Sequence, residues 1–236
     1  MTKQALWSEI ADTLAADLAR GAYRPGDRLP SEAELARRFG VNRHTLRRAL
    51  ARLTAEGRLF PRRGAGVFVA ELPVTDYPLS RRVRFSQAVN AAGQAASRRF
   101  SRIETRGADA EEAQQLNLLP GAPVHVVEGV SLADATPLAA FRSVFPAERF
   151  PGLPARLSET GSITQALRIE GLLDYTRATT RIVAKTAGPA LAARLMLVQG
   201  APILRTHAVN VDGTGQPVEY GTTWFAGDRV ALTVAP

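Results

Sequence analysis

Four arginines recur at helical spacing between residues 43 and 52, and a histidine and a threonine stand beside the first of them. A guanidinium group offers paired donors that match guanine edges and phosphate oxygens. Leu46, Leu50 and Leu53 fall on the other side of the same expected helix, where they face a core. The polar set consists of Arg43, His44, Thr45, Arg47, Arg48 and Arg52. This pattern indicates a helix that binds a nucleic acid, although four arginines on one helix are often only a solvated surface.

The elements around this helix favour a helix–turn–helix. Ser31 and Glu34 have capping-box spacing, so a helix begins there, and Gly40 is a typical left-handed end. Asn42 is expected to cap the arginine-bearing helix, whose first turns would lie against base edges in a major groove. Leucine and isoleucine at helical spacing over residues 6–18 predict a preceding helix that closes a three-helix core.

A short β-hairpin is expected after the third helix, over residues 59–69. Its tip is basic and contains glycine, which lets the backbone approach a phosphate closely; the tip residues are Arg62, Arg63 and Gly64. The positive charge of the chain is concentrated in the same region, because residues 20–63 carry 12 arginines against four acidic residues, a balance of +8 that equals the net charge of the whole chain. One such patch is expected for phosphate neutralisation. The reading as a merely solvated surface is therefore the weaker one.

From Pro30 the chain reads Pro-Ser-Glu-x-x-Leu-Ala-x-x-Phe-Gly-Val-x-Arg-x-Thr-x-Arg-x-Ala-Leu, then Glu-Gly and Gly-x-Gly-x-Phe-Val. This series resembles the winged helix–turn–helix of the GntR (gluconate-repressor) family, and the match runs from about Pro25 to Val69. The resemblance implies a bacterial transcription regulator that binds double-stranded DNA as a homodimer at a pseudo-palindromic operator.

The family's DNA contacts carry over onto Arg43, His44, Thr45, Arg47, Arg63 and Gly64. Ser31 is expected to serve as the cap and also to touch a phosphate. The chain departs from some relatives at Ala33, where they place an arginine.

The composition excludes several kinds of site. There is no cysteine, so disulfides, thiolate metal sites and cysteine nucleophiles are ruled out. His44, His125 and His207 show no catalytic-triad or metal-ligand spacing, and we expect the last two to be satisfied groups within strands. Gly64 to Gly66 precede a strand rather than the helix that a phosphate loop requires. No apolar run approaches membrane-spanning length, so we expect a cytoplasmic protein, not an enzyme, that needs no cofactor or metal.

Three segments are expected along the chain: a DNA-binding domain over residues 1–70, a linker with two prolines over 71–80 and a second domain over 81–236. The second domain is predicted to be α+β with an antiparallel sheet, because its β-branched and aromatic runs alternate with short helical stretches. The expected strands are Ser97–Arg106, Val124–Ala133, Pro137–Phe145, Tyr175–Lys185, Ile203–Asp212 and Pro217–Phe225. The expected helices are about Arg81–Ala92, Ala110–Leu116, Ser162–Ile169 and Pro189–Met196.

Two segments of this domain echo each other. Leu116-Asn-Leu-Leu-Pro-Gly-Ala-Pro123 corresponds to Leu195-Met-Leu-Val-Gln-Gly-Ala-Pro202, and each follows a short helix and precedes two strands joined by an Asp-centred turn. We therefore expect a duplicated domain with a cavity between its halves. The alternative is that Gly-Ala-Pro is only a common turn.

Further motifs in this half resemble the UTRA effector-binding domain of the HutC subfamily, whose fold is that of chorismate lyase. They are Leu132–Pro137, Phe145–Pro151, Gln216–Gly221 and the closing Gly227-Asp-Arg. Val41–Leu50 together with Pro78–Ser86 resemble the regulators of phosphonate uptake and carbon–phosphorus bond cleavage. Relatives that respond to phosphorylated sugars carry arginines where this chain reads Glu128-Gly-Val-Ser-Leu132, so the resemblance favours a different anion.

A small anionic effector requires guanidinium groups, hydroxyls and backbone N–H groups that converge in a cavity. Arg82, Arg84 and Ser86 stand where the linker meets the second domain, and Ser162 begins a helix whose N-terminus can hold an oxyanion. The full set of expected effector residues is Arg82, Arg84, Phe85, Ser86, Arg142, Ser162, Arg177, Glu219, Tyr220 and Phe225.

The leading hypothesis is a sequence-specific repressor of phosphonate uptake or degradation genes, controlled by a small anion. One alternative is a regulator of another catabolic operon with a sugar-phosphate, amino-acid or histidine-type effector. Two more are an enzyme like chorismate lyase, because a fold alone does not define a function, and a nonspecific DNA-coating protein. The nearly neutral second domain argues against DNA coating.

Overall fold

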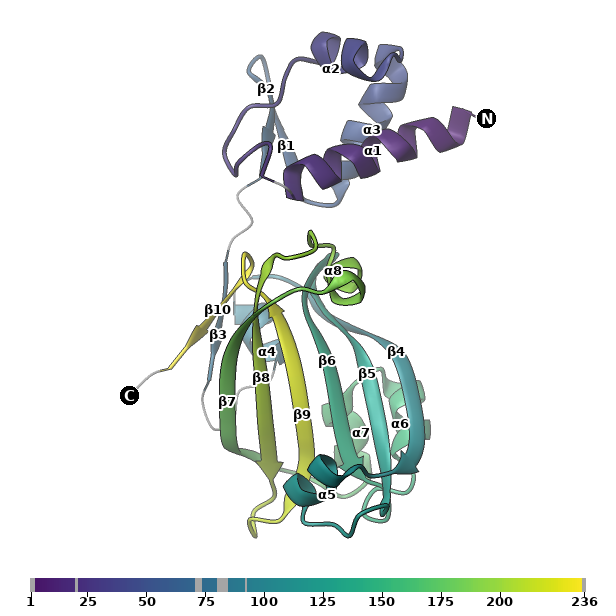
Figure 1. Ribbon diagram of the computed structural model, residues 1–236, viewed down its shortest axis with the longest axis vertical. Coiled ribbons are helices and arrows are strands. Elements are labelled where there is room, and N and C mark those ends of the chain that lie inside the picture. The colour runs from purple at the N-terminus through teal and green to yellow at the C-terminus, as the bar shows by residue number, and fades with distance from the viewer. Residues whose placement is uncertain (1–2, 20, 71–73, 80–84, 92, 235–236) are drawn as a thin grey trace. The chain divides into compact units, whose positions relative to one another are not determined.

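The protein is described from a computed structural model that covers residues 3–19, 21–70, 74–79, 85–91 and 93–234. The chain divides into two compact units, residues 1–73 and 74–236. The described elements of the first unit are α1 (Lys3–Ala19), α2 (Glu32–Phe39), α3 (Arg43–Ala55), β1 (Leu59–Arg62) and β2 (Gly66–Val69) (Figure 1). These elements confirm the predicted winged helix–turn–helix.

Local chemistry sets the ends of α2 and α3 as the sequence predicts. The Glu34 N–H donates to Ser31 Oγ over 3.3 Å, and the Glu34 carboxylate accepts from the Ser31 N–H over 2.7 Å. The side-chain hydrogen bond from Ser31 is the main cause that lowers the pKa of Glu34. Gly40 ends α2 with φ +63°, a left-handed conformation that favours glycine. Asn42 then caps α3 by accepting from the Thr45 N–H over 2.9 Å.

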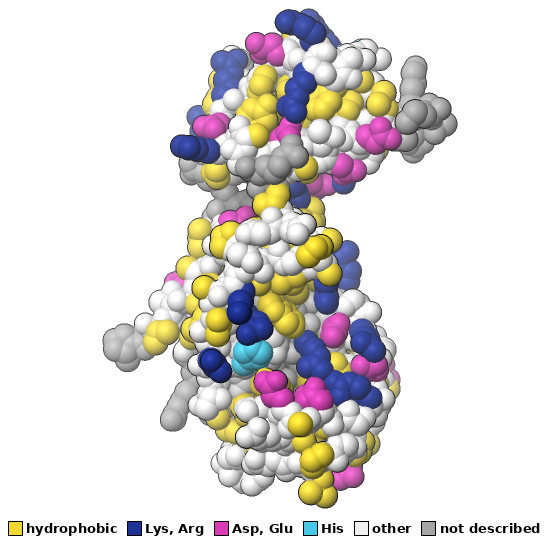
Figure 2. Space-filling view, in the orientation of Figure 1, with side chains coloured by type: hydrophobic (Ala, Val, Ile, Leu, Met, Phe, Trp, Pro, Cys, Tyr) yellow, Lys and Arg dark blue, Asp and Glu magenta, His cyan; other side chains and the backbone are white. Residues whose placement is uncertain are grey.

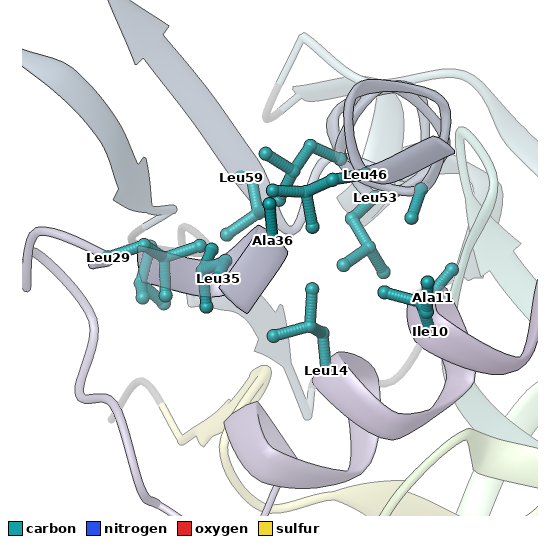
Figure 3. Packing of buried hydrophobic residues seen from close by; sticks show 12 residues of the cluster. Ile10, Ala11, Leu14, Leu29, Leu35, Ala36, Leu46, Leu53 and Leu59 are labelled. Atoms are coloured by element: carbon teal, nitrogen blue, oxygen red, sulfur yellow. The ribbon is translucent and has the colours of Figure 1, made fainter. Parts of the chain in front are cut away.

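The three helices and the hairpin of the first unit share one apolar core (Figure 3). Leu14, Leu46 and Leu53 are almost completely buried in it. One prediction for α1 is wrong, because Leu6 is 41% exposed and lies outside the core, whereas Ile10 is buried. The core orients α3, whose remaining faces are left for other contacts.

The second unit is built around an antiparallel sheet, in agreement with the predicted α+β class. Its described elements are β3 (Thr75–Pro78), α4 (Phe85–Ala91), β4 (Ala96–Gly107), α5 (Ala110–Leu116), β5 (Pro123–Ala133), β6 (Thr136–Pro146), α6 (Leu153–Thr160), α7 (Ile163–Ile169), β7 (Thr176–Thr186), α8 (Pro189–Leu195), β8 (Pro202–Val211), β9 (Pro217–Ala226) and β10 (Val230–Thr233). The six-stranded sheet has the order β4-β5-β6-β9-β8-β7.

This strand order is symmetric, as expected for two repeats that meet at β6 and β9. Each repeat consists of a strand, a short helix and a hairpin. The helix ends match in detail: Asn117 after α5 and Met196 after α8 both adopt left-handed φ, at +54° and +53°. The hydrogen bond from Leu118 N to Ala113 O recurs from Leu197 N to Ala192 O, each over 2.8 Å. The duplication predicted from the echo is therefore present in the fold.

Helices cover the two faces of this sheet differently (Figure 1). One face packs against α6 and α7, in a core that includes Phe141, Phe145 and Leu167. The opposite face, which is toward the viewer in Figure 1, carries α5 and α8.

The linker prediction over residues 71–80 is wrong in part. Residues 75–78 form β3, which pairs in parallel with β10 near the other end of the chain. Because this pairing joins residues far apart in the sequence, no local pattern predicts it, and β10 is absent from the expected strands. The helix α6 is likewise absent from the expected helices. The helix predicted over 81–92 is described as α4, Phe85–Ala91.

Candidate nucleic-acid interface and ligand cavity

The first turns of α3 leave a polar surface that the protein core does not use. Arg43, His44 and Arg47 are exposed. Arg43 and Arg47 stand one turn apart, so their side chains lie on the same side of the helix. Arg47 Nε lies 2.8 Å from Glu32 Oε2 of α2, an exposed ion pair that a nucleic acid can replace. This surface matches the part of a second helix that enters a major groove.

Two of the predicted DNA-contact arginines are instead turned toward α1. The Arg48 guanidinium lies 4.8 Å from the centre of the Trp7 ring. Arg52 donates to Glu56 over 2.8 Å and to Ser8 over 2.9 Å, and it also pairs with Asp12 at 3.1 Å. The prediction that Arg52 contacts a nucleic acid conflicts with these contacts, because its bonds to Ser8 and Asp12 connect α3 to α1.

The hairpin of β1 and β2 presents a basic tip. Arg62 stacks on both Phe60 and Phe68, with its guanidinium 5.0 and 4.9 Å from the two ring centres. Arg63 and Gly64 are exposed at the turn, where Gly64 has φ +76°. The aromatic platform fixes the direction of Arg62, and Arg63 remains available to a phosphate.

A cavity of about 300 Å³ lies in the second unit, on the face of the sheet that α7 covers. Its size is at the lower end of small-molecule sites. Four of the predicted effector residues line it: Phe85, Arg177, Glu219 and Phe225. Polar lining residues that the sequence did not single out include Arg98, Thr164, Asp174, Tyr175, Thr180 and Asn210.

The cavity contains polar atoms with no described partner. Arg177 Nε and Nη1 and Thr180 Oγ1 are buried, and none of them makes a hydrogen bond within the described part of the chain. Unpaired buried donors are costly, so a built cavity that holds three of them is suited to an acceptor-rich ligand. These three atoms are polar groups of the cavity lining that the described protein leaves without a hydrogen bond.

Three residues that line the cavity, one of them Arg177, form a row across three neighbouring strands of the sheet. Arg177 on β7 lies opposite Asn210 on β8, which in turn lies opposite Glu219 on β9. Asn210 Nδ2 donates to Glu219 Oε2 over 2.7 Å. All three residues line the cavity.

A smaller cavity of about 140 Å³ shares Phe85, Arg98 and Thr164 with the first and is also lined by Ser86 and Ser162. The Arg98 guanidinium lies 5.2 Å from the Phe141 ring centre and 5.8 Å from that of Phe85. Ser162 caps α7 by accepting from the Gln165 N–H over 3.4 Å. The serines predicted for the effector site therefore lie beside the main cavity rather than within it.

Arg142 and Tyr220, which the sequence also places among the effector-binding residues, do not line this cavity. Side chains alternate between the two faces along a strand, and the neighbours Phe141 and Gly221 already line the cavity. Arg142 consequently pairs with Glu112 on α5. Tyr220 donates to Glu111 Oε1 over 2.5 Å, and burial together with this bond raises its pKa. On that face of the second unit acidic and basic side chains lie next to one another (Figure 2).

Arg82 and Arg84 lie outside the described residues, so their roles stay predictions from the sequence. His125 and His207 are satisfied groups, as predicted. His125 Nε2 lies 3.1 Å from Phe150 O, and burial lowers its pKa. His207 Nδ1 lies 3.1 Å from Thr222 Oγ1.

β-Bulges explain why strand alternation alone does not predict the cavity lining. The β7–β8 register shifts between Arg177 and Thr179, which brings Arg177 and Thr180 onto the same face. Another shift follows Asn210 on β8. Arg98 and Asn210 lie on strands that were predicted correctly, but the sequence contains no local signal for these bulges.

Two known protein families match this chain, one for each of its two units. Residues 6–69 match the model of bacterial regulatory proteins of the gntR family, and residues 91–231 match the model of the UTRA domain. Helices long and apolar enough to cross a membrane do not occur among the described residues.

Two curated relatives are similar over nearly the whole chain. An uncharacterized HTH-type transcriptional regulator of Rhizobium meliloti (strain 1021) is 39% identical, with 98% of this chain and 94% of the relative covered. The probable transcriptional regulator PhnF of Escherichia coli (strain K12) is 34% identical, with coverages of 97% and 94%. The crystal structure of PhnF from Mycobacterium smegmatis has a TM-score of 0.64 at 29% identity and covers 96% of this chain and 98% of its own.

Proposed function

The chain belongs to the GntR family of bacterial regulatory proteins and carries a UTRA domain, and from this premise we propose that it is a sequence-specific repressor whose DNA binding is controlled by a small ligand with an anionic group. The family membership makes it a transcriptional regulator. We assign DNA binding to the first unit, and ligand binding and self-association to the second. The observation that carries the ligand assignment is the set of buried donors on Arg177 and Thr180 that find no hydrogen-bond partner in the described part of the chain.

We assign direct DNA reading to Arg43, His44 and Arg47 at the exposed start of α3. A bidentate arginine–guanine contact supplies about 1–3 kcal/mol of discrimination. Arg63 and Gly64 at the hairpin tip contact the phosphate backbone in this proposal, which adds affinity but little sequence preference. The ion pair between Arg47 and Glu32 is exchanged for DNA contacts.

Ligand binding would reach the first unit through β3. Tyr77 and Leu79 line the cavity, and the chain continues from β3 directly to the first unit. Tyr77 also packs on Phe225, with ring centres 5.2 Å apart. A ligand that binds better to one position of β3 shifts the equilibrium between DNA-binding and released states.

The energy available is sufficient for such a switch. Moving an equilibrium from almost fully bound to almost fully released requires about 5.5 kcal/mol of differential binding. Two or three charge-assisted hydrogen bonds, each about 1.5–3 kcal/mol, can provide this amount. Arg177 presents two buried nitrogens that make no hydrogen bond to the described residues, and they are available for that purpose.

Self-association belongs to the same proposal. One recognition helix contacts only a few base pairs, so two half-sites about one helical turn apart are expected. The edge strand β7 is exposed along most of its length, and its Ile182 is 42% exposed. An edge of this kind offers unpaired backbone groups to a second copy. Motifs shared with regulators of phosphonate uptake favour phosphonate genes as the target.

Selection of DNA sites by the full chain tests this function. Purified protein is incubated with a pool of random duplexes, and bound DNA is amplified and sequenced over several rounds. We expect convergence on an inverted repeat with half-sites about 10 base pairs apart. A pool that remains random, with only salt-dependent binding, would show nonspecific DNA coating instead.

A further inference from the structure

The cavity of the second unit is lined by charges of both signs. Among its described lining residues, Arg98 and Arg177 are basic, and Asp174 and Glu219 are acidic. We propose that the ligand is a small zwitterion, with an oxyanion such as phosphonate at one end and a protonated amine at the other. This inference rests on the proposed ligand-controlled function and specifies the chemical class of the ligand.

Arg177 and Thr180 bind the anionic end. Arg177 presents Nε and Nη1, and Thr180 presents Oγ1, all buried and without hydrogen bonds to described residues. Phosphonate and carboxylate groups have several acceptor oxygens, and guanidinium binds such groups in a bidentate manner. One oxyanion can thus accept hydrogen bonds from all three of these buried donors.

Glu219 binds the ammonium end. Glu219 is only 9% exposed, and its Oε2 accepts one hydrogen bond, from Asn210. Oε1 accepts none from the described residues. A Cβ built at Gly221 would lie in van der Waals contact with Oε1, at 3.7 Å, so glycine leaves that contact position beside the oxygen unfilled. A buried carboxylate requires a cation or further donors, and an ammonium group supplies both.

The spacing between the two ends follows from the strand register. Arg177, Asn210 and Glu219 occupy one row across three neighbouring strands. Neighbouring strands are about 4.8 Å apart, so the outer two backbones are about 10 Å apart. Because both side chains extend into the cavity, the remaining gap suits charges separated by a chain of a few carbons.

A ligand with an anionic group alone would leave the carboxylate unmatched. It would meet Arg177 favourably, but Glu219 would keep a buried negative charge with no cationic partner among the described residues, and like charges repel strongly in such surroundings. Arg177 and Glu219 therefore together select a ligand that carries both charges. An ammonium group on the ligand improves binding only if Glu219 is charged.

Isothermal titration calorimetry with the full chain tests the proposal. The probes are aminomethyl-, 2-aminoethyl- and 3-aminopropylphosphonate, each compared with the alkylphosphonate in which a methyl group replaces the ammonium. For the best chain length we expect the amine to bind about 10 to 100 times more tightly, the range of one charge-assisted hydrogen bond. Glu219→Gln should remove this preference, and Arg177→Gln should abolish binding of both members of the pair.

Glu111→Gln is the matched control, since this carboxylate accepts from Tyr220 on the opposite face of the sheet and should leave every affinity unchanged. Equal binding of amine and alkyl probes to the unaltered protein would overturn the inference, whether or not the variants fold, and would leave an anion-controlled regulator intact. Absence of binding by all six probes would also overturn it. Binding to a selected DNA site, measured in parallel, reports separately on the proposed regulatory function.

Discussion

Arg142 on β6 lies directly opposite Thr222 on β9, and each stands five residues after the proline near the start of its strand, Pro137 or Pro217. Equivalent residues of the two repeats thus face each other at the centre of the sheet, which places the local two-fold axis of the duplication between them. The repeats differ at this point, because Arg142 pairs with Glu112, whereas the second repeat has Leu191 at the position that corresponds to Glu112.

Glu112 should make the stability of the second unit dependent on acid pH. Its side chain is 1% exposed, and Arg106 donates to it over 2.6 Å. Burial alone would raise its pKa, but hydrogen bonds from Arg106, the Asp109 N–H and Arg142 lower it to about 2. A carboxyl with a lowered pKa in the folded state stabilises fully above its unfolded pKa of about 4.3. This contribution, on the order of 3 kcal/mol, should be lost as the pH falls from about 4.5 to 2.

Urea unfolding of Glu112→Gln measures this contribution. At pH 7 we expect a loss of about 3 kcal/mol, because two arginines lose a charged partner. The double variant Glu112→Leu, Arg142→Thr introduces the residues of the second repeat and should recover part of the loss. A Glu112→Gln protein that keeps the acid sensitivity of the original would contradict the assignment.

Arg47 and Arg52 should have separable roles on one helix. Arg47→Ala is expected to lower affinity for the selected DNA site by about 5-fold to 150-fold and to relax its sequence preference, because a bidentate base contact is lost. Arg52→Ala should keep the sequence preference and lower the unfolding free energy of the first unit by about 1 kcal/mol, since it loses contacts with Glu56 and Ser8. Fluorescence anisotropy with the selected duplex and a scrambled duplex distinguishes the two variants. If Arg47→Ala keeps the sequence preference of the original protein, Arg47 does not contact the bases.

Arg84 is expected from the sequence to take part in the ligand response rather than in DNA binding. Arg84→Ala should keep affinity for the selected site but lose release by the ligand. Arg63→Ala, at the exposed hairpin tip, should do the reverse, with weaker DNA binding and an unchanged ligand response. Titration of ligand into preformed protein–DNA complexes measures both effects. Weaker DNA binding with intact release in Arg84→Ala would mean that this arginine extends the DNA surface.

Self-association should survive removal of the first unit. A fragment that begins at Val74 retains β3 and its pairing with β10. Sedimentation equilibrium is expected to give twice the monomer mass for this fragment and for the full chain. A monomeric fragment from a dimeric full chain would move the interface to the first unit.

The sequence by itself determined the elements whose causes are local. The capping box of Ser31 and Glu34, the left-handed Gly40 and the leucine spacing of α3 act over three or four residues, so they specify the helix–turn–helix without reference to the rest of the chain. Alternating and β-branched runs predicted the six strands of the main sheet in the same way. The echo of Leu116–Pro123 in Leu195–Pro202 also indicated the duplication.

Only the tertiary structure decided which side chains meet. β3 pairs with β10 across more than 150 residues, and this pairing shortened the expected linker. One bulge in β7 brings Thr180 onto the same face as Arg177, while unbroken alternation sends Arg142 and Tyr220 to the other face. Strand register depends on contacts between distant segments, and a shift of one residue exchanges the faces of a strand. The helices could therefore be predicted from neighbouring residues, whereas the ligand cavity required the assembled sheet.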